Sequence, residues 1–165
     1  MTDVEESGLN GLIHGEMAPG FIGLLLGRIV DRLVEEGVPP AREAGITAPP
    51  RTFSMIMLLA RASQTVTELA QRLGVTHAAI IKTERTLEKL GLVERGQDHG
   101  DARRKPLCLT AQGRAEAARI ADFMARVNRV YAGLFEEIGV DLFAAARAFD
   151  AALDREGFAE RYRRF

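Results

Sequence analysis

Apolar residues recur at the spacing of helix turns along most of this chain. Between residues 21 and 36 they cover more than one side of the expected helix, and residues 53–60 form a short, largely apolar run. Apolar surfaces this wide need packing partners on more than one side. Helical spacing also extends over residues 117–138 and 142–153. The pattern predicts a mainly α-helical fold with long helices towards both ends.

Glycines, prolines and a capping aspartate indicate where these helices are expected to begin and end. A glycine and two prolines within residues 37–40 predict that the first long helix stops there, with a loop as far as residue 48. Residues 1–19 are acidic and contain glycines, which predicts a frayed lead-in. Gly139 is expected to interrupt the long helix near the C-terminus, and Asp141 to cap the last one.

Two short helices joined by a tight turn are predicted between residues 66 and 90. Residues 66–73 have one apolar face, and Gly74 can adopt the left-handed conformation that often ends a helix. Val75 is expected to point inward, and Thr76 is a suitable N-cap for a second helix over residues 77–90. Two helices connected in this way form a helix-turn-helix.

After this motif the apolar spacing changes from helical to extended. Residues 92–95 and 107–109 are predicted strands, and the polar residues 97–104 between them contain a glycine. The expected product is a β-hairpin with a basic tip, which is a wing. The predicted fold is therefore mainly α with a small β-wing.

We expect one intertwined domain with three regions. Residues 1–48 would form a lead-in and a dimerisation helix, residues 49–113 a winged helix-turn-helix that binds DNA, and residues 114–165 further dimerisation helices. The terminal helices are assigned to dimerisation because the small winged region offers too little surface to cover them.

Composition narrows the classes of protein. Apolar residues make up 47 % of the 165 and charged residues 27 %, which is typical of a soluble globular protein. The net charge is −1, yet residues 61–105 carry nine basic against six acidic side chains. No apolar run is long enough to span a bilayer, and the single cysteine fits a reducing compartment. A cytoplasmic protein with no membrane association is predicted.

Nothing in the sequence indicates an enzyme, a metal site or a cofactor. The three histidines and Cys108 lack the spacing of zinc ligands, and no phosphate-binding loop or nucleophile motif is present. Strand alternation places Leu107 and Leu109 on one side and Cys108 on the other. A plain strand residue is therefore favoured over a redox sensor at Cys108.

Several segments resemble the multiple antibiotic resistance regulator (MarR) family of transcription regulators. The resemblance lies in residues 66–70, 73–76 and 87–95, and most specifically in residues 101–113, which match the pattern D-x-R-x-x-x-L-x-L-T-x-x-G of the family's wing. It implies a homodimer with interlocked terminal helices and two winged lobes. It also implies a repressor that leaves DNA when a small molecule binds.

Six residues of the second helix are candidates for contact with DNA: Thr76, His77, Ala78, Ile81, Lys82 and Arg85. Thr76 and His77 lie where helix N–H groups favour a phosphate, although Thr76 is also a plain cap and His77 a plain solvated residue. Lys82 is placed for a backbone or guanine contact. Arg85 is equally placed to pair with a glutamate of its own helix, Glu84 or Glu88.

Ala78, Ala79 and Ile81 depart from the family, which often has polar residues at these positions. Small apolar groups can touch thymine methyls, but they donate no hydrogen bonds. The departure weakens the case for tight, specific readout of bases. Phosphate contacts, which give affinity without specificity, are unaffected.

By the resemblance, Arg103 reaches towards the minor groove and Asp101 braces it, while Arg104 and Lys105 attract phosphate. The alternative for these residues is a solvated run of charges at a hairpin tip. Candidate liners of a ligand pocket are Arg51, Phe53 and Met57. Ordinary core packing is the simpler role for the last two.

The predicted function is that of a sequence-specific DNA-binding transcription regulator, a repressor released by a small-molecule ligand. Its partners would be a pseudo-palindromic operator in duplex DNA and a second copy of the chain. The alternative is a winged-helix protein-interaction module with weak or non-specific DNA binding, which the apolar residues Ala78, Ala79 and Ile81 keep open. A DNA-compacting role is disfavoured by the near-neutral net charge.

Overall fold

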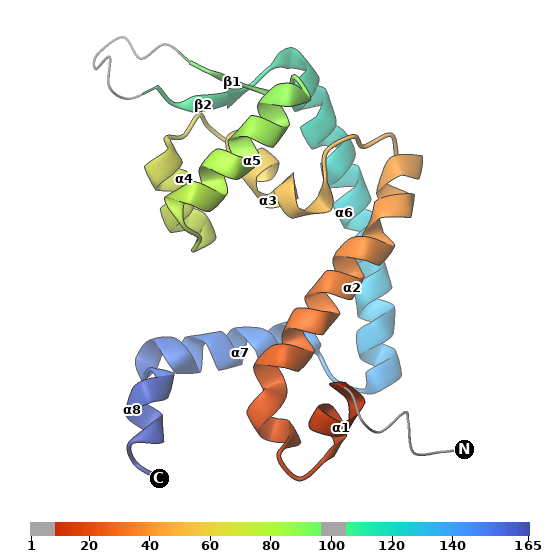
Figure 1. Cartoon of the computed structure of the whole chain (residues 1–165). Coiled ribbons are helices and arrows are strands. Elements are labelled where there is room, and N and C mark those ends of the chain that lie inside the picture. Colours follow the sequence, from red (N-terminus) through yellow and green to blue (C-terminus); the bar gives the residue numbers. More distant parts are fainter. Residues whose placement is uncertain (1–8, 97–104) are drawn as a thin grey trace. The chain divides into compact units, whose positions relative to one another are not determined.

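The structure is a computed structural model that describes residues 9–96 and 105–165 (Figure 1). The chain divides into two compact units, Met1–Ala121 and Asp122–Phe165. In chain order the elements of the first unit are α1 (Leu9–His14), the 3-10 turn η1 (Ala18–Phe21), α2 (Ile22–Glu43), η2 (Pro50–Thr52), α3 (Phe53–Leu59), α4 (Val66–Leu73), α5 (His77–Lys89), β1 (Val93–Arg95), β2 (Leu107–Leu109) and the start of α6 (Ala111–Ile138). The second unit contains the rest of α6, then α7 (Leu142–Arg155) and α8 (Phe158–Tyr162). The predicted class, mainly α with a small β-wing, is confirmed.

The N-terminal elements differ from the prediction in two places. The described part of the expected lead-in is ordered into α1 and η1, with Pro19 in the first turn of η1, where its fixed φ is favourable. The helix expected to stop at residues 37–40 continues through Pro39 and Pro40 to Glu43. The predicted stop at residues 37–40 is therefore wrong, and so is the frayed lead-in over residues 9–14 and 18–21, while residues 1–8 lie outside the described residues.

The continuation of α2 has a tertiary cause. The two prolines lack N–H groups, so the helix loses two hydrogen bonds at this point. Its last turn is nevertheless held by the core, because Ala41 is buried and its carbonyl accepts a hydrogen bond of 3.0 Å from the Ile46 N–H. The left-handed residue that follows the helix is Gly45, with φ of 72°, and not Gly37.

The core of the first unit brings the helix-turn-helix and the wing strands together. Its largest fully buried side chains are Met55, Ile56, Leu69, Ile80, Leu87, Leu92, Leu107, Ile120 and Glu116. The strands are antiparallel, with Val93 opposite Leu109 and Arg95 opposite Leu107. Gln64 exchanges two backbone hydrogen bonds with Leu107, of 3.1 and 2.8 Å, and so extends this small sheet.

The second unit carries large apolar side chains that a single chain leaves exposed. Neither α7 nor α8, both fully described, contains a buried residue. Phe143, Phe149 and Phe158 are 66 %, 53 % and 74 % exposed. Asp141 caps α7 as predicted, accepting a hydrogen bond of 2.9 Å from the Ala144 N–H. Exposed aromatic rings of this kind are typical of a surface that packs against another molecule.

Across the residues that the structure describes, no helix combines the length and the apolar character needed to cross a membrane.

Glu116 of α6 is a fully buried carboxylate that joins α6 to the segment between α2 and η2. Its Oε1 accepts hydrogen bonds from the Thr47 N–H (2.6 Å), the Thr47 hydroxyl (2.9 Å) and the Ala48 N–H (2.8 Å). Its Oε2 accepts from the Arg119 guanidinium at 2.5 Å. Burial alone would raise the pKa of Glu116, but the hydrogen bonds from Arg119, Ala48 and Thr47 outweigh it and hold this pKa below its ordinary value.

We predict that Glu116 makes the fold sensitive to acid. Because the pKa is lower in the folded chain, the ionised carboxylate stabilises the fold above the pKa of the unfolded chain, and this contribution is lost as pH falls through the folded pKa. Glu116→Gln should lower the free energy of unfolding at neutral pH by about 2 kcal/mol. It should also reduce the loss of stability on acidification, measured by urea unfolding over a pH series.

The matched control is Glu137→Gln, which removes an exposed carboxylate from the same helix. It should leave both the neutral stability and its dependence on pH close to those of the wild type. Equal pH dependence in the wild type and Glu116→Gln would show that this carboxylate does not control acid stability.

Candidate nucleic-acid interface

The predicted helix-turn-helix is present, with its boundaries set by local capping. Thr65 and Glu68 form a capping box at the start of α4, and Gly74 ends α4 with φ of 64°. Thr76 caps α5, its hydroxyl oxygen accepting a hydrogen bond of 3.2 Å from the Ala79 N–H. The expectation for Val75 is wrong, because this side chain is 44 % exposed. The turn is held through its backbone, the Val75 N–H donating to the Ala70 carbonyl at 3.1 Å.

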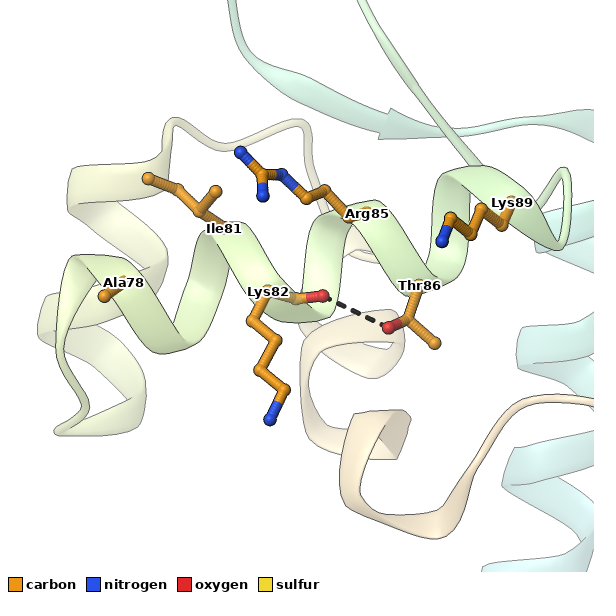
Figure 2. A pocket seen from close by; sticks show the side chains of 6 residues that line it. All are labelled: Ala78, Ile81, Lys82, Arg85, Thr86 and Lys89. Atoms are coloured by element: carbon orange, nitrogen blue, oxygen red, sulfur yellow. Dashed lines mark hydrogen bonds between the residues drawn. The ribbon is translucent and has the colours of Figure 1, made fainter.

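Helix α5 has a buried side and an exposed side. Ile80, Glu84 and Leu87 are buried against the core. The exposed side is slightly hollowed, with a depression of about 440 Å³ (Figure 2). We call its lining residues the recognition face: Ala78, Ile81, Lys82, Arg85, Thr86 and Lys89.

The recognition face contains four of the six helix residues predicted to contact DNA, namely Ala78, Ile81, Lys82 and Arg85. Thr76 and His77 are exposed at the start of the helix and lie outside its lining. Lys89 was not predicted, although its spacing from Lys82 and Arg85 places it on the same side of a helix. In Figure 2, Ile81 and Arg85 extend to one side of the helix and Lys82 to the other.

Hydroxyl and imidazole groups of this region are engaged within the protein. The Thr83 hydroxyl donates to the Ala79 carbonyl (3.0 Å), and the Thr86 hydroxyl donates to the Lys82 carbonyl (3.1 Å; Figure 2). His77 Nε2 lies 3.3 Å from Thr67 Oγ1 of α4, so this ring joins the two helices. The recognition face therefore offers solvent mainly methyl groups and cations.

Charge is also segregated around α5. Lys82, Arg85 and Lys89 are exposed on the recognition face, which contains no carboxylate. Glu84 points to the opposite side, where it is 2 % exposed and pairs with Arg95 of β1 at 2.6 Å. Glu84 thus forms its ion pair with Arg95 instead of Arg85. A helix surface with three cations and no anion is suited to the phosphates of nucleic acid.

The Glu84–Arg95 pair fixes the first wing strand to the recognition helix. This pair was not among the sequence-based predictions. The available signal was the position of Glu84, four residues after Ile80 and three before Leu87, within the apolar stripe. Among the described residues, Glu84 Oε2 has no hydrogen-bond partner. A buried carboxylate of this kind depends strongly on its single counter-ion.

The predicted wing residues fall within or directly after the segment that connects β1 to β2. Asp101, Arg103 and Arg104 lie outside the described residues, and Lys105 is exposed just before β2. On β2, Cys108 is half-buried and its thiol donates to the Glu94 carbonyl at 3.4 Å. Burial, and then the charge of Glu94, raise the pKa of this thiol. A raised pKa keeps the sulfur protonated and unreactive, which favours the plain structural role.

The predicted ligand residues lie in different settings. Arg51 forms an exposed ion pair of 2.5 Å with Asp31 of α2. Phe53 belongs to the buried core, and Met57 is half-buried. A depression of about 560 Å³ lies along α2, and Asp31 is one of its lining residues. Arg51, Phe53 and Met57 do not line it.

Comparisons with known proteins agree with this geometry. Residues 44–104 match the sequence profile of the MarR family. The transcriptional repressor CouR bound to a 23-mer DNA duplex aligns with a TM-score of 0.65 and 27 % identity, covering 84 % of this chain and 96 % of that one. The S. aureus MepR–DNA complex aligns with a TM-score of 0.67 and 18 % identity, covering 80 % and 97 %. The adhesin competence repressor AdcR from Streptococcus pyogenes aligns at 0.53 and 24 %, covering 80 % and 98 %.

No curated protein sequence matches the chain. The motif, the two-stranded wing and the cationic recognition face together define a winged helix-turn-helix transcription regulator that binds DNA. Over residues 44–104 the chain matches the MarR family. The resemblance noted in its sequence is confirmed.

We predict that the Glu84–Arg95 pair stabilises the winged unit. Arg95→Ala should lower the free energy of unfolding by about 3 kcal/mol, because it leaves Glu84 buried without a counter-ion. The double variant Glu84→Gln/Arg95→Ala should lose less than the sum of the single variants, since removing the charge removes that penalty. Urea unfolding of the four proteins measures the coupling.

Arg72→Ala is the control, because it removes an exposed arginine from α4 of the same motif. Its effect should stay within about 0.5 kcal/mol. Strict additivity of the Glu84 and Arg95 substitutions would contradict an energetic role for the pair.

Proposed function

We propose that this protein represses transcription by inserting α5 into the major groove of an operator in duplex DNA. The observation that carries the proposal is the recognition face: a solvent-exposed helix surface with three cations and no carboxylate, opposite a side buried in the core. A helix fits the major groove of B-DNA, and cations beside it neutralise phosphates.

Individual residues are assigned roles by their position on α5. Lys82 and Lys89 are point charges on flexible stems and would contact phosphates, which give affinity and orientation but no sequence information. Thr76 and His77 lie at the start of the helix, where N–H groups face a phosphate. Arg85, with its planar donors, would reach a base edge.

The wing is assigned from the sequence. Arg103 would enter the adjacent minor groove with Asp101 bracing it, and Arg104 and Lys105 would attract phosphate. The Glu84–Arg95 pair supports this arrangement, because it ties the strand leading to the wing to the helix in the major groove.

A homodimer would bind two half-sites of a pseudo-palindromic operator, with α5 of each copy in successive turns of the major groove. Exposed apolar side chains of α2 and of the second unit supply surface for a second copy, including Leu24, Val30, Leu33, Phe143, Phe149 and Phe158. Buried against a partner, such side chains would stabilise the pair by about 2 kcal/mol each.

Release by a small molecule completes the proposal, with Arg51, Phe53 and Met57 as candidate pocket residues and the cytoplasm as the place of action. Of these three residues, Arg51 has the contact that a ligand would replace most easily, because its ion pair with Asp31 is exposed to solvent.

A second candidate function is a winged-helix module that binds protein and contacts DNA weakly. It is favoured by the apolar part of the recognition face, where Ala78 and Ile81 are exposed. The cations around these two residues make DNA the better-supported partner, and the following titration separates the two functions.

We expect tight binding to the intergenic DNA upstream of the protein's own gene, measured by fluorescence anisotropy. Affinity should exceed that for competitor DNA by about 10³-fold or more and should fall steeply with salt. Lys82→Ala should weaken binding to all sequences alike and reduce the salt slope by about 1. Arg42→Ala, at an exposed position near the end of α2, is the charge-matched control and should bind as the wild type does.

Equal affinity for every duplex would favour the protein-interaction module over the repressor. An unchanged salt slope in Lys82→Ala would remove this residue from the interface.

We predict that the apolar surface of the second unit is needed for dimerisation. The wild type should sediment at twice its monomer mass of 18.1 kDa at micromolar concentration. Phe149→Asp should shift it towards the monomer, because a charge would be buried in the interface. Val75→Asp places the same charge at an exposed apolar residue of the helix-turn-helix and should leave the dimer intact. A monomeric wild type would contradict the proposed assembly.

A further inference from the structure

The N-terminal part of the recognition face contains two apolar residues, which restricts what it can recognise in a DNA groove. Ala78 and Ile81 lie on this part of α5, and Ile81 is 38 % exposed. The N-terminal residues of a recognition helix are the ones that contact base edges in the major groove. In this protein those contacts therefore fall to methyl groups.

Neutral polar groups near these residues use part of their hydrogen-bonding capacity within the protein. The Thr76 hydroxyl oxygen accepts from the Ala79 N–H, and the Thr83 hydroxyl donates within its own helix. The His77 ring is held beside Thr67 of α4. Reading adenine in the major groove usually requires a side-chain amide, and the recognition face contains neither asparagine nor glutamine.

The groups that remain match two of the four bases. Thymine presents a C5-methyl group in the major groove, which cytosine, adenine and guanine do not. Guanine presents two acceptors that a guanidinium can bind with both arms. Ile81 and Arg85 extend to the same side of α5 (Figure 2), one helical turn apart, so a methyl contact and a guanine contact can be made side by side.

We propose that this regulator obtains its sequence preference by packing Ala78 and Ile81 against thymine C5-methyl groups, with Arg85 binding a guanine nearby in the same half-site. This inference rests on the proposed function, insertion of α5 into the major groove, and adds the bases it selects. In this arrangement the methyl groups of Ala78 and Ile81 select the base sequence, while Lys82 and Lys89 contact the phosphate backbone of the DNA.

The test replaces thymine by uracil, which pairs identically but lacks the methyl group. The probe is a duplex that the wild-type protein enriches from a random DNA pool, with each thymine changed to uracil in turn. At the thymine facing Ile81, binding should weaken about fourfold, the effect of removing one buried methyl group.

The variant Ile81→Ala makes the test specific to this side chain. It should bind the thymine duplex more weakly than the wild type and lose the sensitivity to uracil at that position. Because Ile81 is exposed, the substitution is not expected to disturb the core. Lys89→Ala, from the same face, is the matched control: it should weaken binding to the thymine and uracil duplexes by the same factor.

The outcomes distinguish this inference from the function on which it rests. An enriched duplex that binds equally well with uracil at every position would overturn the thymine contact and leave the repressor function standing. Sensitivity to uracil that persists in Ile81→Ala would overturn the assignment to this side chain. Failure of the random pool to yield any enriched duplex would count against the repressor function itself.

Discussion

Burial of one side of α5 is the constraint on which the rest of this structure depends. Ile80 and Leu87 are fully enclosed in the core with Leu69 of α4 and with Leu92 and Leu107 beside or within the wing strands. The same packing leaves the other side of α5 in solvent, with its cations and its two apolar residues facing outward. Because a packed core resists rotation of the helix about its axis, the composition of the recognition face is fixed before any ligand arrives.

Two buried carboxylates add polar connections between segments that are distant in the chain. Glu84 ties α5 to β1, and Glu116 ties α6 to the segment after α2. Glu116 has five donors around it, whereas Glu84 has one oxygen paired and the other without a partner among the described residues. Buried pairs are modest contributors to net stability, but their geometry is demanding. The value of the Glu84–Arg95 pair to a DNA-binding protein lies in holding α5 and the first wing strand at a fixed spacing.

The recognition face also explains how a chain with a net charge of −1 can serve as a DNA-binding regulator. Glu84 is buried and the recognition face itself contains no carboxylate, so this part of the surface is cationic although the whole chain is not, with Glu88 exposed outside the lining of the face. Electrostatic attraction depends on this local field and falls off over about 8 Å in physiological salt. The same segregation places the apolar residues Ala78 and Ile81 among cations, where they add shape and methyl contacts to an otherwise non-specific surface.

The sequence by itself determined the elements whose causes are local. Gly74 and Thr76 set the turn and the start of α5, Asp141 capped α7, and the alternation of residues 107–109 placed β2. Each of these signals acts through the backbone within a few residues, so it can be recognised without knowledge of the fold.

Tertiary structure alone decided the features that join distant segments. The path of α2 through Pro39 and Pro40 follows from the burial of Ala41, and the partner of the buried Glu84 is Arg95, which reaches it from β1. Val75, expected to be buried, is exposed, and its turn is held by backbone hydrogen bonds. Such outcomes depend on which side chains reach the core from elsewhere in the chain, and periodicity within one segment carries no information about those partners.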